Sequence, residues 1–129
     1  MTSSITVYIL DDDESIQRAI ARIMRASRFQ PVCVNSVEEL LAQELPANEA
    51  VIIADVNTAR QFADTLPWQL HGQNRSLPVI YMTEYDTEWI RNEAKRVGAA
   101  GYFRKPVDEQ ALVDAIEFAV RRTTAEAVS

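Results

Sequence analysis

The segment that decides the fold is Ala50-Val-Ile-Ile-Ala-Asp55, an uninterrupted apolar run that ends in a carboxylate. A strand that is apolar at every position is typical of a parallel sheet covered by helices on both faces. Four further strand-like runs are expected along the chain, over 5–10, 31–34, 77–82 and 101–103. Helical periodicity separates most of them, so the sequence predicts an α/β domain with a parallel sheet and right-handed crossovers.

Apolar spacing predicts the helices between these strands. In the first and the last of them, apolar residues recur at i, i+3, i+4, i+7 and i+8. These residues are Ile16, Ala19, Ile20, Ile23 and Met24, and then Leu112, Ala115, Ile116, Ala119 and Val120. Two more helices are expected, from Ser36 to a stop before Pro46 and from Asp86 to Val97. Another helix belongs between 56 and 76, but Pro67 interrupts it and leaves its boundaries open.

The composition indicates one globular domain. The chain has 129 residues, of which 47% are hydrophobic and 25% charged, as is usual for a folded protein. With a net charge of −6 and no apolar run of transmembrane length, we expect no direct binding to nucleic acid or membrane. A single cysteine and the lack of a signal-peptide pattern point to a cytoplasmic location. We expect a domain over 1–122, and a polar tail or the start of a linker over 123–129.

Polar side chains stand where four of the expected strands end. Asp11 and Asp12 follow the first strand, Asp55 the third, Thr83 the fourth and Lys105 the fifth. Because parallel strands bind ligands at their shared carboxyl edge, these side chains are expected at one site. Clustered carboxylates favour a hard cation such as Mg²⁺, and Asp55 beside it would be a nucleophile toward phosphorus. Each residue alone also fits a helix cap or a loop, but the combination favours a phosphoryl site.

Around these residues the sequence resembles the receiver domain of bacterial two-component response regulators. The resemblance covers residues 5–122, and its motifs are VYILDDDE (7–14), VIIAD (51–55), VIYMT (79–83) and VGAAGYFRKP (97–106). It implies a flavodoxin-like (βα)5 fold, a doubly wound five-stranded parallel sheet with strand order 2-1-3-4-5. The residues of its motifs are most similar to those of receivers that precede a helix-turn-helix output domain.

The resemblance also implies roles for individual residues. Asp55 is then the phosphoacceptor, and the expected donor and partner is a sensor histidine kinase. Mg²⁺ would be bound by Asp12, Asp55 and the backbone carbonyl of Asn57, while Asp11 would hold a metal-bound water. The implied class is a phosphoacceptor signalling domain and not an enzyme, although it assists its own phosphorylation and dephosphorylation.

Phosphorylation is expected to act through a switch. Lys105 would pair with the phosphoryl group, Thr83 would move inward to hydrogen-bond it, and Tyr102 would turn from exposed to buried. The surface formed by the fourth helix, the fifth strand and the fifth helix would then change its preference for a partner, including a second copy of the chain in a homodimer. The expected output is transcription.

The chain departs from the family pattern at two places. After Asp55, receivers continue as x-x-Met-Pro, whereas residues 56–59 here read Val-Asn-Thr-Ala. A small residue usually follows the threonine, whereas Glu84 and then Tyr85 follow it here. The candidate modulators of phosphorylation are Asn57, which lies in the altered loop, and Glu84 and Tyr85, which follow the threonine. The alternative is a degenerate receiver that serves as a phosphorylation-independent interaction or dimerisation module.

Overall fold

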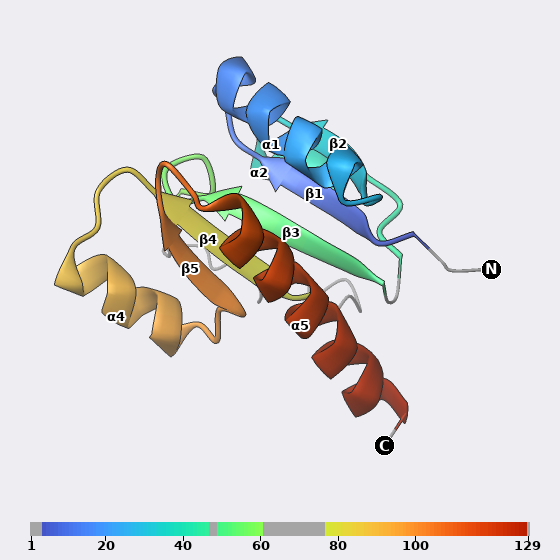
Figure 1. Cartoon of the computed structure of the whole chain (residues 1–129). Coiled ribbons are helices and arrows are strands. Elements are labelled where there is room, and N and C mark those ends of the chain that lie inside the picture. The colour runs from blue at the N-terminus through green and yellow to red at the C-terminus, as the bar shows by residue number, and fades with distance from the viewer. Residues whose placement is uncertain (1–3, 47–48, 61–76, 129) are drawn as a thin grey trace.

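Five parallel strands form one sheet (Figure 1). The computed structural model describes residues 4–46, 49–60 and 77–128, with the backbone alone described from residue 123. The strands are β1 Thr6–Leu10, β2 Gln30–Val34, β3 Ala50–Asp55, β4 Val79–Thr83 and β5 Gly101–Arg104. Their order is β2-β1-β3-β4-β5 and all neighbouring pairs are parallel. The predicted flavodoxin-like topology is confirmed.

Helices cover both faces of the sheet (Figure 1). Two of them, α1 Glu14–Ala26 and α5 Glu109–Val128, pack on one face. Of the described helices, α2 Val37–Leu41 and α4 Glu88–Arg96 pack on the opposite face. This is the doubly wound arrangement that the apolar β3 segment predicted. The further helix expected around Pro67 would fall within residues 61–76, which lie outside the described part of the chain.

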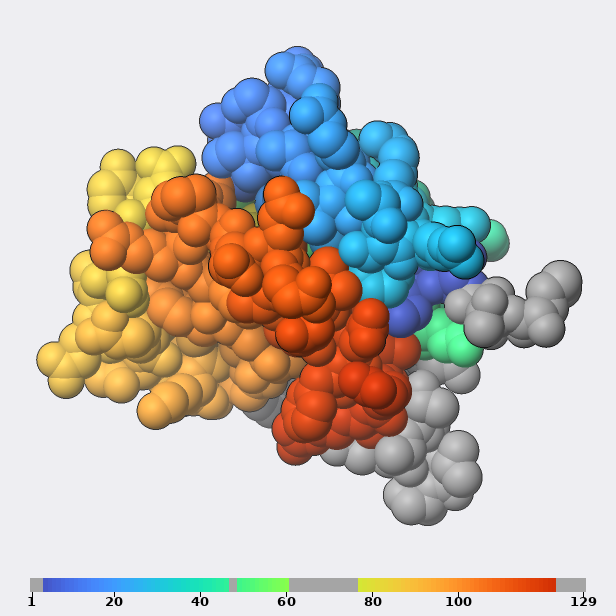
Figure 2. Space-filling view, in the orientation of Figure 1, coloured from blue at the N-terminus to red at the C-terminus, as the bar shows by residue number. Residues whose placement is uncertain are grey.

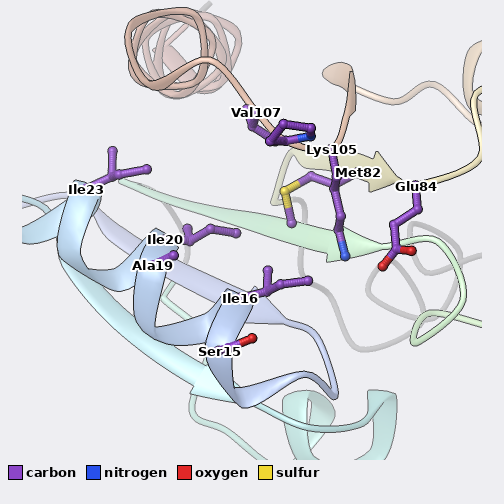
Figure 3. A pocket seen from close by; sticks show the side chains of 10 residues that line it. Ser15, Ile16, Ala19, Ile20, Ile23, Met82, Glu84, Lys105 and Val107 are labelled. Carbon is purple, nitrogen blue, oxygen red and sulfur yellow. The ribbon is translucent and has the colours of Figure 1, made fainter.

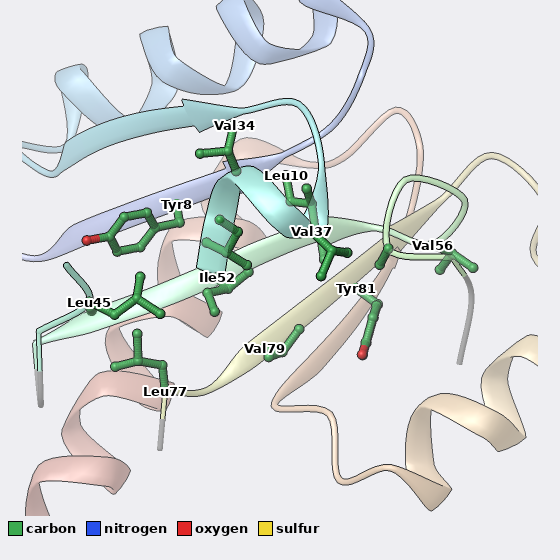
Figure 4. Close-up of a cluster of buried hydrophobic side chains, with 14 of the residues drawn as sticks. Tyr8, Leu10, Val34, Val37, Leu45, Ile52, Val56, Leu77, Val79 and Tyr81 are labelled. Atoms are coloured by element: carbon green, nitrogen blue, oxygen red, sulfur yellow. The ribbon is translucent and has the colours of Figure 1, made fainter. Parts of the chain in front are cut away.

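Alternating strand side chains build two hydrophobic cores. In β1, Val7 and Ile9 point into the core beneath α1 and α5. Tyr8 and Leu10 point the opposite way, into the core beneath α2 and α4 (Figure 4). All six residues of β3 are buried, and burying one Val or Ile side chain stabilises a fold by about 1.5–3 kcal/mol. The β3 strand therefore belongs to both cores and fixes the position of Asp55 at its end.

The α1 helix is turned further about its axis than the apolar spacing predicted. Its buried residues are Gln17, Ile20, Ala21 and Met24. The prediction was wrong for Ala19, which is exposed, and Ile16 and Ile23 are only partly buried. The apolar stripe of α1 is therefore only partly covered, and Ile16, Ala19 and Ile23 line an open space beside the sheet.

The last helix is longer than expected. The buried face of α5 is confirmed by Leu112, Ile116, Ala119 and Val120. The backbone continues as a helix over 123–128, where we expected a polar tail or a linker. That segment contains no Gly or Pro to end a helix. The domain boundary at 122 stays a prediction.

Candidate functional site

The strand register brings the polar strand ends to one edge of the sheet. The pairing of β1 with β3 places Asp11 beside Asp55, at the carboxyl ends of both strands. The pairings of β3 with β4 and of β4 with β5 bring Thr83 and Lys105 to the same edge. Asp11, Asp55 and Thr83 are buried. The structure therefore brings these four predicted site residues together.

Lys105 joins the two buried carboxylates. Its Nζ donates hydrogen bonds to Oδ2 of Asp11 and to Oδ1 of Asp55, each at 2.8 Å. The Lys105, Asp11 and Asp55 side chains are 10%, 2% and 11% exposed. These two ion pairs are therefore shielded from water, and charges attract more strongly in such surroundings than at the surface.

Burial and pairing act on these groups in opposite directions. Burial raises the pKa of Asp11, and the hydrogen bond from Lys105 opposes this effect without cancelling it. For Lys105, burial alone lowers the pKa, but the bonds to Asp11 and Asp55 together outweigh burial, so the pKa is raised. The ammonium therefore stays charged at neutral pH, which is what binding of anionic oxygens requires.

The second oxygen of Asp55 is held by Thr58, a residue that the sequence analysis did not assign to the site. The backbone N–H and the hydroxyl of Thr58 both donate to Oδ2 of Asp55, at 2.9 and 3.0 Å. The same hydroxyl accepts a hydrogen bond from the N–H of Asp12, at 3.2 Å. Asp side chains commonly bond to backbone groups a few residues ahead in turns. The Asp-x-x-Thr spacing was thus the signal that could have identified Thr58.

A cavity of about 220 Å³ opens at this acidic edge. It is lined by Asp11, Asp12, Asp13, Ile16, Asp55, Asn57, Glu84, Tyr85 and Lys105. Carboxylate and carbonyl oxygens are the ligands that Mg²⁺ prefers, so the residues fit this cation. Within residues 4–46, 49–60 and 77–128, however, no three acidic, histidine or cysteine side chains converge as a preformed metal site.

Asp12 and Asn57 lie at the rim of the cavity. Both residues are exposed, unlike the buried Asp11 and Asp55. The backbone carbonyl of Asn57 accepts a hydrogen bond from the N–H of Arg60, at 3.0 Å. A carbonyl oxygen has a second lone pair, so this contact leaves Asn57 able to act as a ligand.

The two predicted switch residues are held in separate networks. The Thr83 hydroxyl accepts from the N–H of Tyr85 at 3.0 Å and donates to the Tyr85 carbonyl at 3.3 Å. The Tyr102 hydroxyl donates to Asp86 at 2.9 Å, and Arg91 donates to the same carboxylate oxygen at 2.7 Å. Burial, together with the bond to Asp86, raises the pKa of Tyr102 to about 12. The bonds from Tyr102 and Arg91 lower the pKa of Asp86.

An apolar groove adjoins the acidic cavity. Its volume is about 540 Å³ and its lining residues are Ser15, Ile16, Ala19, Ile20, Ile23, Met82, Glu84, Lys105, Pro106 and Val107. Figure 3 shows the isoleucines of α1 on one side of the groove and Val107 on the other. Glu84 and Lys105 line both spaces, so the groove and the cavity meet there. Both α1 (blue) and α5 (orange to red) reach the surface on the face seen in Figure 2.

Gln17 is a second residue that the sequence analysis missed. It is buried, and its side-chain amide donates to the backbone carbonyls of Asp11 and Val34 and to the side chain of Asn35. These bonds tie the ends of β1 and β2 to α1 and so hold the acidic loop in place. The signal was its position one turn before Ala21, among the apolar residues of α1.

Comparison with known proteins agrees with this fold. The response regulator receiver domain, as a family, matches residues 7–117. The transcriptional regulatory protein FixJ of Azorhizobium caulinodans is 25% identical over 123 residues, which cover 95% of this chain and 58% of FixJ. The response regulator protein FleR of Pseudomonas aeruginosa is 29% identical over 110 residues, which cover 85% of this chain and 23% of FleR. This chain thus spans little more than half of FixJ and about a quarter of FleR.

Two solved structures have the same fold. The crystal structure of FixJ-N superposes with a TM-score of 0.79 at 25% identity and covers 94% of this chain and 96% of its own. The structure of response regulator StyR superposes with a TM-score of 0.82 at 23% identity, covering 97% of this chain and 63% of StyR.

Fold and site together define the class of protein: a doubly wound α/β domain with an acidic, lysine-bridged site at the carboxyl edge of its sheet. The chain belongs to the response regulator receiver domain family of two-component systems. This family is a signalling family, and relatives such as FixJ are transcriptional regulators. In the described ranges, no helix combines the length and the hydropathy that crossing a bilayer needs.

Proposed function

We propose that this receiver domain accepts a phosphoryl group on Asp55 from the phosphohistidine of a sensor histidine kinase. The observation that carries the proposal is the double contact of Lys105 with Asp11 and Asp55. A buried ammonium next to the acceptor carboxylate can also bind the oxygens of an incoming phosphoryl group. The negative charges of Asp11 and Asp55 in turn balance the positive charges of Lys105 and of the proposed Mg²⁺.

In the proposed reaction, a carboxylate oxygen of Asp55 attacks the phosphorus atom as the bond from phosphorus to the imidazole nitrogen breaks. Lys105 would bind one equatorial phosphoryl oxygen and neutralise part of its charge. The hydroxyl of Thr83 would leave the backbone of Tyr85 and donate to another of these oxygens. Bound Mg²⁺ would supply further positive charge. Its proposed ligands are Asp11 through a water, Asp12, Asp55 and the backbone carbonyl of Asn57.

The proposed switch links this site to the surface formed by α4, β5 and α5. When Thr83 turns toward the phosphoryl group, it gives up both hydrogen bonds to Tyr85. Tyr102 would then exchange its bond with Asp86 for a buried position. Trp89 of α4 is 57% exposed and Phe118 of α5 is 62% exposed, which supports a role for this surface in binding. We propose that it controls transcription through an output domain or through a homodimer.

We also propose that the donor domain docks over the apolar groove. Partly open apolar side chains of α1 form one wall of the groove, and Lys105 lies at its junction with the acidic cavity. A partner covering Ile16 and Ile23 would gain apolar burial. It would also bring its phosphohistidine to the acceptor.

A second candidate function is a receiver that binds partners without being phosphorylated. The observation that favours it is Glu84, whose exposed carboxylate lines both the cavity and the groove. A negative charge at this junction repels an incoming phosphoryl group. The experiment must therefore separate loss of phosphorylation from exclusion of one particular donor.

The test is the intact mass of the protein after incubation with Mg²⁺ and either acetyl phosphate or a phosphorylated histidine kinase domain. We expect a metal-dependent phosphoryl adduct that is absent from Asp55→Asn. Glu84→Ala serves as a matched variant, and we expect it to react faster with acetyl phosphate because it removes the repelling charge. If neither donor gave an adduct in the unaltered protein or in Glu84→Ala, the second candidate function would replace the first.

A further inference from the structure

The acceptor carboxylate is hydrogen-bonded on both sides before any phosphoryl group arrives. Oδ1 of Asp55 accepts from Lys105, which in turn binds Asp11. Oδ2 accepts from both the N–H and the hydroxyl of Thr58. A carboxylate oxygen has two lone pairs in the plane of the group. The two donors of Thr58 therefore use the full acceptor capacity of Oδ2.

The Thr58 hydroxyl lies between two groups that the proposed Mg²⁺ site must bring together. It is 3.0 Å from Oδ2 of Asp55 and 3.2 Å from the backbone nitrogen of Asp12. Oδ2 is thus the oxygen of Asp55 that faces the loop carrying Asp12, while Oδ1 faces the Lys105 ammonium. A cation shared by Asp12 and Asp55 would reach Asp55 from the side that the hydroxyl occupies.

We propose that Thr58 is a positioning residue that holds Oδ2 of Asp55 in a resting state and competes with Mg²⁺ for that oxygen. In this state the hydroxyl links the acceptor to the Asp12 loop. Binding of the cation requires the hydroxyl to leave Oδ2, whereas the N–H of Thr58 can remain in place. Thr58 thereby sets the Mg²⁺ concentration at which the domain becomes ready for phosphorylation. The inference rests on the proposed function of Asp55 and adds a control of that site.

The size of the effect follows from the kind of hydrogen bond that is lost. A hydrogen bond to a charged group is stronger than one between neutral groups. Replacing the hydroxyl with a methyl group of similar size removes this competitor and leaves the backbone N–H. We therefore expect Mg²⁺ to bind Thr58→Val about three- to tenfold more tightly. Thr58→Ser restores the hydroxyl and is expected to return the dissociation constant toward that of the unaltered protein.

The experiment has two readouts on the unaltered protein, Thr58→Val and Thr58→Ser. Titration calorimetry measures the dissociation constant for Mg²⁺ directly, with no phosphorylation involved. The rate of reaction with acetyl phosphate is then measured across Mg²⁺ concentrations. Thr58→Val should react faster at low Mg²⁺, and the difference should shrink as Mg²⁺ saturates both proteins. A merely structural role of Thr58 would instead lower the melting temperature and the rate at every Mg²⁺ concentration.

The outcomes separate this inference from the proposed function. If the unaltered protein bound Mg²⁺ and Thr58→Val bound it equally or more weakly, the competition would be refuted and the function of Asp55 would stand. If Thr58→Val and Thr58→Ser both bound Mg²⁺ more tightly, the hydroxyl would not be the cause, and the inference would again fail. If neither the unaltered protein nor Thr58→Val bound Mg²⁺, both the inference and the metal-dependent function would be wrong.

Discussion

Replacing Lys105 with methionine is the most direct test of the buried charge cluster. The substitution keeps a long apolar side chain but removes the ammonium that lies 2.8 Å from both Asp11 and Asp55. All three side chains are nearly excluded from water, so two carboxylates would remain buried without their cation. Removing one partner of a buried ion pair costs about 3–5 kcal/mol. Because water from the adjoining cavity can enter the space that the ammonium leaves, we expect the lower end of this range, about 3 kcal/mol at neutral pH.

The loss of stability should depend on pH. Without Lys105, the hydrogen bond that opposes the raised pKa of Asp11 is gone. A carboxyl whose pKa is higher in the folded than in the unfolded protein binds more protons when folded, so stability falls as the pH rises through the folded pKa. The difference in the free energy of unfolding between Lys105→Met and the unaltered protein should therefore be small near about pH 4 and large near about pH 7.

Urea denaturation in the presence of a chelator measures this difference at several pH values. The matched control is Lys95→Met, because Lys95 is the only other lysine of the sequence and is exposed in the last turn of α4. We expect the control to change the free energy of unfolding by less than about 1 kcal/mol. A loss below about 1 kcal/mol in Lys105→Met, or a larger loss with no pH dependence, would refute the electrostatic reasoning.

Three further changes test the surroundings of the site. In Tyr102→Phe, the pKa of Asp86 measured by NMR should rise toward 3.8, because the hydrogen bond that lowers this pKa most is lost. Asp86 stabilises the fold at pH values above its unfolded pKa and loses this contribution as the pH falls through its folded pKa, so the contribution should shrink in the variant. An unmoved pKa would mean that the Tyr102 bond does not form in solution. Gly98→Ala should lower the free energy of unfolding by about 1–2 kcal/mol through backbone strain. Gly98 has a φ of +76°, and nothing lies within 4 Å of an added Cβ, so no steric clash contributes. An unchanged stability in chemical denaturation would show that the backbone at Gly98 adopts another conformation. Gln17→Met should cost about 1–3 kcal/mol because it removes the side-chain donor from the buried carbonyls of Asp11 and Val34, although Val34 keeps the N–H of Asp11. An equally stable variant would contradict the role of Gln17 in holding the acidic loop.

Local sequence pattern predicted much of the fold. The apolar run of β3 predicted a strand covered on both faces, and every residue of β3 is buried. The spacing of Leu112, Ile116 and Val120 predicted the buried face of α5. The strand-end positions of Asp11, Asp55, Thr83 and Lys105 predicted a shared edge because parallel strands all end on one side. These features depend on hydrophobic periodicity and chain direction, which are properties of the sequence itself.

Other features depended on how the elements pack. Apolar spacing alone did not fix how far α1 is turned, because only part of the apolar stripe that contains Ala19 packs on the sheet and the rest lines the groove. Which residues of this stripe enter the core and which line the groove is decided only by the packing of α1 on the sheet. Likewise, Asp86 precedes α4 and Tyr102 lies in β5, and only the packing of these elements lets them share a hydrogen bond.

The sequence by itself determined a parallel α/β sheet, its two apolar faces and the residue types at its carboxyl edge, and its resemblance to receivers implied the strand order. Only the tertiary structure decided which oxygen of Asp55 meets Lys105 and which meets Thr58. The reason is physical: Lys105 reaches Asp11 across 94 positions of the chain and Asp55 across 50. Hydrogen-bond partners so far apart in sequence are set by strand register and side-chain geometry within about 3 Å, and local patterning does not encode these.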